Sequence, residues 1–171
     1  MASNIPYPDK KIIRVVPTLD TSAYAVDDVL FTGVEIPNAV FSNGGCSELK
    51  HMFVVDRADS GDIDIQFLFT EKNTAFGTQN ATADISAANL KAIGFCGYAL
   101  MDGGNASTGN DIDNATIHKV MSASGPSEPH APLTLLQAES DSTSVYVSAV
   151  IRSGTPTFAA DSLDLIFHIE Y

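Results

Sequence analysis

Histidine and cysteine are the residue types in this chain with the clearest potential for catalysis. The chain has four histidines, His51, His118, His130 and His168, and two cysteines, Cys46 and Cys96. No two of them stand at the close spacing of a zinc site, and no local signature pairs a thiol with an imidazole. A nucleophilic pair would need the fold to bring distant residues together. We therefore expect no enzyme, no catalytic residues and no cofactor.

Oxygen ligands gather in one polar stretch between Asp102 and Asn114, which holds three aspartates and three asparagines. Carboxylate and carbonyl oxygens on a flexible backbone are the ligands that calcium prefers. The stretch lacks the glutamate and the spacing of an EF-hand. A structural cation and a solvated loop are both open interpretations, and we assign no metal ligands.

The chain has 21 acidic and only 9 basic residues. Three of the basic residues, Lys10, Lys11 and Arg14, form its one basic cluster in the sequence. Residues 1–11 contain two prolines, which cannot donate to a strand ladder, so we expect an extended N-terminal arm there. The cluster is either simply solvated or docks on an acidic partner. We take Lys10, Lys11 and Arg14 as candidate partner-binding residues.

The overall composition limits the classes of partner. A net charge of −12 repels phosphate backbones and anionic lipid, so we expect neither nucleic acid nor membrane as a partner. Apolar residues make up 44% of the chain and charged residues 18%, which is typical of a folded domain. The first residues contain no hydrophobic signal-peptide core, which predicts synthesis in the cytoplasm. The length suits a single domain, which we place at residues 12–171.

Alternating and β-branched segments predict a mainly antiparallel all-β fold, either a β-sandwich or jelly-roll-like, with about eight or nine strands. The only expected helix is short, spans residues 82–92, is capped by Thr82 or Asp84, and ends at Gly94. A turn at residues 59–61 predicts a hairpin between its two flanking strands. The expected strands cover residues 12–16, 29–31 with 34–40 as one bent strand, 48–56, 63–69, 93–101, 115–121, 133–137, 144–151 and 163–171.

The last of these strands alternates most regularly. Its odd-numbered residues, from Leu163 to Tyr171, are apolar and should face a core. The even-numbered residues should face water, yet Ile166 stands among them between Asp164 and His168. We therefore add Ile166 to the candidate partner-binding residues.

Two segments resemble a known family. Residues 17–30 read PTLDTSAYAVDDVL, and residues 152–158 read RSGTPTF, just before the closing strand. Both are similar to segments of structural proteins of tailed-bacteriophage virions, where a Pro-x-Leu-Asp-Thr-x-x-Tyr turn leads into the next strand. Between them lie strands similar to those of this family, at residues 53–56 and 65–69.

The resemblance implies a virion protein of the capsid decoration, or cement, type. Such a protein would lie on the outer surface of the capsid and would bind the major capsid protein and its own copies, as a homotrimer or homodimer. A neck or tail component is the alternative within the same family. A carbohydrate-binding sandwich module, with Tyr98 or Tyr146 stacking on sugars, is an alternative from another class.

Overall fold

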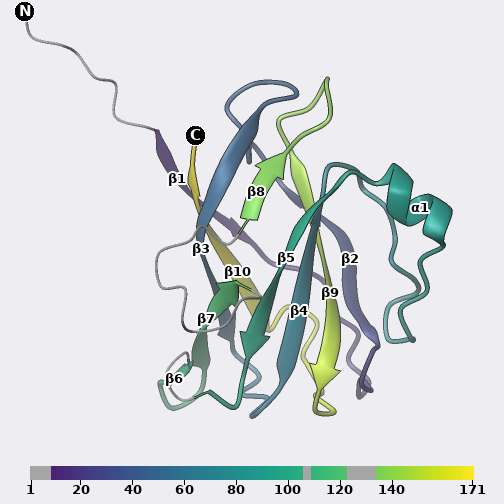
Figure 1. Cartoon of the computed structure of the whole chain (residues 1–171). Coiled ribbons are helices and arrows are strands. Elements are labelled where there is room, and N and C mark those ends of the chain that lie inside the picture. Colours follow the sequence, from purple (N-terminus) through teal and green to yellow (C-terminus); the bar gives the residue numbers. More distant parts are fainter. Residues whose placement is uncertain (1–8, 106–108, 123–133) are drawn as a thin grey trace, which may run out of the picture.

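The closing strand of the chain lies inside the sheet. A computed structural model describes residues 9–105, 109–122 and 134–171 (Figure 1). Strand β10 (Leu163–Glu170) pairs with β1 (Lys10–Val15) on one side and with β3 (Cys46–Asp56) on the other. The Tyr171 N–H donates to the Asp9 carbonyl oxygen at 3.0 Å. The prediction that the closing strand is built into the sheet is confirmed.

The sheet is antiparallel throughout the described residues, as predicted for an all-β, sandwich-like fold. Its strands follow the order β1-β10-β3-β7-β5-β4-β9-β2, while β6 pairs with β7 and β8 pairs with β3. Ten strands form where eight or nine were expected, because β6 arises within the polar stretch that was expected to be a loop. The remaining bounds are β2 (Val29–Ile36), β4 (Asp64–Thr70), β5 (Phe95–Asp102), β6 (Gly109–Asp111), β7 (Thr116–Ser122), β8 (Thr134–Gln137) and β9 (Val145–Ser153).

The sheet curls so that its two halves face one another. We call β1, β10, β3 and β7 the first half, and β5, β4, β9 and β2 the second half (Figure 1). Phe167 of β10 meets Phe69 of β4 with ring centroids 6.3 Å apart, in an edge-to-face contact between the halves. The inward residues of β10 are at most 1% exposed and belong to one large core cluster. Burial between the halves is therefore what holds the two layers together.

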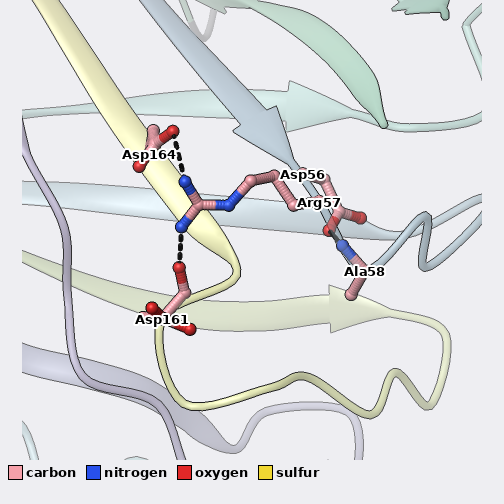
Figure 2. Close-up of polar contacts among 5 residues, drawn as sticks. All are labelled: Asp56, Arg57, Ala58, Asp161 and Asp164. Carbon is pink, nitrogen blue, oxygen red and sulfur yellow. Dashed lines mark hydrogen bonds and ion pairs between the residues drawn. The ribbon is translucent and has the colours of Figure 1, made fainter. Parts of the chain in front are cut away.

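The predicted hairpin between β3 and β4 is wrong. Strand β3 pairs with β10, β7 and β8, whereas β4 pairs with β5 and β9, so residues 57–63 cross from the first half to the second. Alternation specifies which face of a strand is buried, but not which strand lies beside it. The crossing is stabilised by Asp56, which is 1% exposed and accepts a hydrogen bond from the Ala58 N–H at 2.8 Å (Figure 2). Asp56 also accepts a hydrogen bond from the Ser60 N–H at 2.8 Å.

Strand β2 is bulged, as expected for its two broken segments. Its pairing with β9 shifts register twice, and Gly33 adopts a φ of +60°. The Gly33 N–H donates to the buried Ser148 hydroxyl at 2.9 Å. Glycine suits this position because its φ is positive.

The helix is shorter than predicted, and its expected caps are wrong. Helix α1 (Ala87–Ala92) begins after Ser86, whose hydroxyl accepts from the Asn89 N–H at 3.1 Å. Thr82 instead forms a β-bridge with Asp28, just before β2, and the Asp84 N–H donates to the Phe76 carbonyl oxygen within the same connection. Gly94 follows the helix at a φ of +61°, which confirms the predicted end. No helix of the described residues is long and apolar enough to span a bilayer.

Because inward and outward residues alternate along β10, substitutions at two adjacent residues should differ greatly in their effect on the free energy of unfolding. Phe167→Ala removes a fully buried ring and should lower the free energy of unfolding by about 3–5 kcal/mol. Ile166→Ala, one residue earlier on the opposite face, should cost less than about 1 kcal/mol. Chemical denaturation of both variants measures this. Equal losses would contradict the orientation of the strand.

Candidate functional site

Three rows of side chains cross the first half on the side that faces away from the core. The strand pairings place Arg14, Ile166, Phe53 and Lys119 in one continuous row across all four strands. Side chains of a strand alternate between its two faces, so the rows two residues away in either direction share this surface. We call it the outer face. Its members are Ile12, Arg14, His51, Phe53, Val55, Ile117, Lys119, Asp164, Ile166 and His168.

The outer face is partly apolar. Ile12 is 51% exposed, and the central pair Ile166 and Phe53 is half-buried. The outward side of the second half differs, because Val29, Phe76 and Ile93 form a second buried cluster there beneath the segment that contains α1. The described residues contain no comparable buried cluster over the outer face. It is the side of the sheet that the described chain leaves open.

The outer face carries two cations, Arg14 and Lys119, and one carboxylate, Asp164, although the chain as a whole is acidic. Asp164 lies 3.0 Å from Arg57 (Figure 2), and Glu170 at the rim lies 3.6 Å from Lys50. Lys50 also binds Glu48 at 2.9 Å. The described residues place no carboxylate within 4 Å of the Arg14, Lys119 or Lys10 side-chain nitrogens. Within the described residues, these three cations thus have no ion-pair partner.

Two histidines extend the outer face toward one end of the sheet. His51 and His168 are register partners, with ring centroids 6.1 Å apart, and His168 also contacts Phe53 at 5.4 Å. Burial lowers the pKa of His51, and the positive charges of Lys119, His168 and Lys50 add to that effect. The direction of the shift agrees with a positive local potential. Both histidines lie on strands of the sheet surface, as the sequence predicted.

The structure brings three of the four candidate partner-binding residues to one surface. Arg14 lies directly opposite Ile166 in the pairing of β1 with β10, and Lys10 lies on the same side of β1. Lys11 points to the other side, where it lines a shallow groove with Phe41 and Tyr171. Lys10 and Lys11 belong to β1, which begins two residues before the strand expected at 12–16. Residues 1–8 of the expected arm lie outside the described residues.

Sequence reasoning missed Phe53 and Lys119 as members of this surface. Each occupies the polar-side position of an alternating strand, so its outward orientation could have been inferred. Their position beside Ile166 could not, because it depends on β3 and β7 being neighbours. The pairing of strands distant in sequence is the missing information.

The two segments that resemble virion proteins contact one another. The Tyr24 N–H donates to the Pro156 carbonyl oxygen at 2.9 Å, and the Tyr24 ring meets Phe158 edge-on at 5.9 Å. Arg152 forms an ion pair with Asp27 at 2.7 Å. Tyr24 is 1% exposed, and its hydroxyl accepts from the Asp20 N–H at 2.8 Å. These residues therefore stabilise the connection between β1 and β2 rather than line a site.

The cysteines show no geometry of an activated nucleophile in the described residues. The Cys96 thiol donates to the Gly94 and Gln137 carbonyl oxygens, each at 3.6 Å, and burial raises its pKa. Cys46 is exposed at the start of β3. A thiol with a raised pKa stays protonated near neutral pH and is a weak nucleophile.

The polar stretch lies beside a cleft of about 330 Å³, whose lining includes Asp59, Asp62, Asp111 and His118. Within residues 9–105, 109–122 and 134–171, no three histidine, cysteine or acidic side chains converge as a metal site would require. Asp111 lies on β6 and accepts from the Asp113 N–H at 3.0 Å. The described part of the stretch is thus a small β-structure, and the structural cation finds no support there. His130 lies outside the described residues.

Comparisons of the chain with protein-family models and with curated protein sequences find no match. The two tyrosines considered for sugar stacking lie on the outward side of the second half, Tyr98 on β5 and Tyr146 on β9, with β4 between them. The outer face is the surface with the most distinct chemistry in the described chain.

Removal of the buried Tyr24 hydroxyl should measurably lower the stability of the protein. Tyr24→Phe leaves the Asp20 N–H without its acceptor and should lower the free energy of unfolding by about 1–2 kcal/mol. Tyr98→Phe is the control, because Tyr98 is 43% exposed and should tolerate the change. Urea denaturation compares the two, and an unaffected Tyr24→Phe variant would contradict the role given to this hydroxyl.

His118 predicts a loss of stability on acidification. It is 2% exposed, and burial lowers its pKa below the ordinary 6.5, while the charge of Asp56 opposes the shift. The folded state therefore binds fewer protons at this site than the unfolded chain, and its stabilising contribution is lost as pH falls from 6.5 toward the lowered pKa. We expect unfolding free energies measured between pH 7 and pH 5 to fall less steeply in His118→Leu. An unchanged slope would contradict this.

Proposed function

We propose that the protein is a structural component of a phage virion, specifically a capsid decoration protein that binds the outer surface of the head and stabilises it. The single observation that supports a binding role most strongly is the outer face. It is a partly apolar sheet surface in a chain of net charge −12, and the part of the chain that the structure describes neither covers it nor pairs its cations Arg14 and Lys119 with a carboxylate. Surfaces of this kind, apolar with a polar rim, are typical of protein interfaces.

The two virion-like segments give the proposal its specific class. Residues 17–30 and 152–158 are far apart in sequence, yet they meet through Tyr24, Pro156 and Phe158. Together, the two segments support the proposal that the protein shares both the fold and the role of this virion family.

Self-association is part of the proposed role. Among the described strands, β1 pairs with β10 alone and ends the sheet on one side. An end strand has backbone groups that can pair with another chain unless something covers them. Copies arranged around a symmetry axis of the shell, as a homodimer or homotrimer, would cover such edges while each copy binds the major capsid protein.

The protein would stabilise the shell because its binding is linked to shell assembly. A protein that binds the assembled shell and not its separated subunits lowers the free energy of the assembled state by its binding free energy. Many copies acting together would raise the temperature at which the shell opens. This mechanism needs no catalytic group, and it uses the acidic surface outside the outer face for solubility.

The test compares phage heads that contain the protein with heads that lack it. Heads without the protein should open at a lower temperature, and adding the purified protein should restore the difference, as measured by release of packaged DNA. Particle images should show added density on the head surface. Equal heat tolerance would exclude the cement role, and density only at the neck or tail would favour the alternative location.

A further inference from the structure

We propose that the outer face is the surface that docks on the shell, and that its partner is an acidic protein surface with an apolar centre. This inference rests on the proposed function, because it names the face and the partner chemistry of that binding. Arg14 and Lys119 would each pair with a carboxylate of the partner. Ile166 and Phe53 would pack between these ion pairs.

The geometry of the central row defines the partner. Arg14, Ile166, Phe53 and Lys119 occupy equivalent positions on four adjacent strands. Neighbouring strands lie about 4.8 Å apart, so the two cations are anchored roughly 14 Å from one another. The complementary surface would present two carboxylates at a similar separation with apolar side chains between them. Such a central apolar contact, flanked by charge pairs, is typical of the residues that contribute most of the binding energy.

The charge distribution favours a partner other than a second copy of this chain. Two outer faces packed together around a two-fold axis would bring Arg14 and Lys119 of one copy against the same cations of the other. Docking the outer face on an acidic region of another copy would be a heterologous contact, which produces an open filament unless its rotation closes into a ring. An acidic surface on a different protein meets neither difficulty.

A purely protective role accounts for only part of the basic charge. Cations on an end strand prevent unwanted strand pairing, and Lys10 and Arg14 lie on β1, the end strand. Lys119 lies on β7, which is not an end strand, because β3 pairs with it on one side and β6 and β5 pair with parts of its other side. Its exposure beside the half-buried Phe53 is what an interface position requires.

The experiment measures binding of the purified full chain to heads that lack it, treated with nuclease to remove exposed DNA. The test variant combines Arg14→Glu with Lys119→Glu. The control combines Lys72→Glu with Lys91→Glu, which changes the net charge equally on the segment that covers the second half. Neutral Arg14→Gln with Lys119→Gln serves as a milder second test. Thermal unfolding and light scattering verify that each variant is folded and report its oligomeric state.

We expect the charge-reversed variant to bind heads at least 10-fold more weakly than the wild type, with a smaller effect of the neutral variant and none of the control. Ile166→Ser should also weaken binding, whereas Leu90→Ser, an exposed site on helix α1, should not.

Equal binding by the wild-type and outer-face variants would overturn this inference and leave the proposed function standing. A changed oligomeric state of the outer-face variants would identify the face as a contact between copies and would also overturn it. Binding to untreated heads that is lost after nuclease treatment would identify nucleic acid as the partner and would overturn this inference. No binding by the wild type would overturn the proposed function and this inference together.

Discussion

The alternation of β10 is the constraint on which the rest of the structure depends. Its inward residues, including Phe167, close the core against the second half, while its outward residues, including Ile166, form the middle of the outer face. Because the strand lies between β1 and β3, one short segment determines both the packing of the two layers and the composition of the exposed surface. A shift of register by one residue would exchange these two sets.

The two halves of the curled sheet differ in whether another segment of the chain covers their outward side. The second half is covered on its outward side by the segment that includes α1, which buries Val29, Phe76 and Ile93. The outer face of the first half has no such cover among the described residues, and its side chains combine apolar groups with unpaired cations. This asymmetry is the physical basis for assigning binding to one side. It arises because the connection between β4 and β5 is long enough to fold back over one layer.

Residues 17–30 and 152–158 stabilise the fold, whereas the outer face is the proposed binding surface. Tyr24 and Phe158 are buried and hold the β1–β2 connection against the segment before β10. They therefore support the architecture in which β1 lies beside β10. Arg14 and Ile166 reach their common surface because of that arrangement. These buried residues therefore relate to the proposed interface through the fold.

The sequence alone determined the all-β class, the buried and exposed sides of β10, the bulge in β2 and the glycine that ends α1, because these depend on local alternation and backbone preference. The tertiary structure alone decided that β3 pairs with β10 and β7 instead of β4, and that β6 forms within a polar stretch. Alternation is a property of one strand, whereas pairing depends on which distant strands can share a core. For that reason the sequence indicated Arg14 and Ile166 separately, and only the fold placed them on one surface with Phe53 and Lys119.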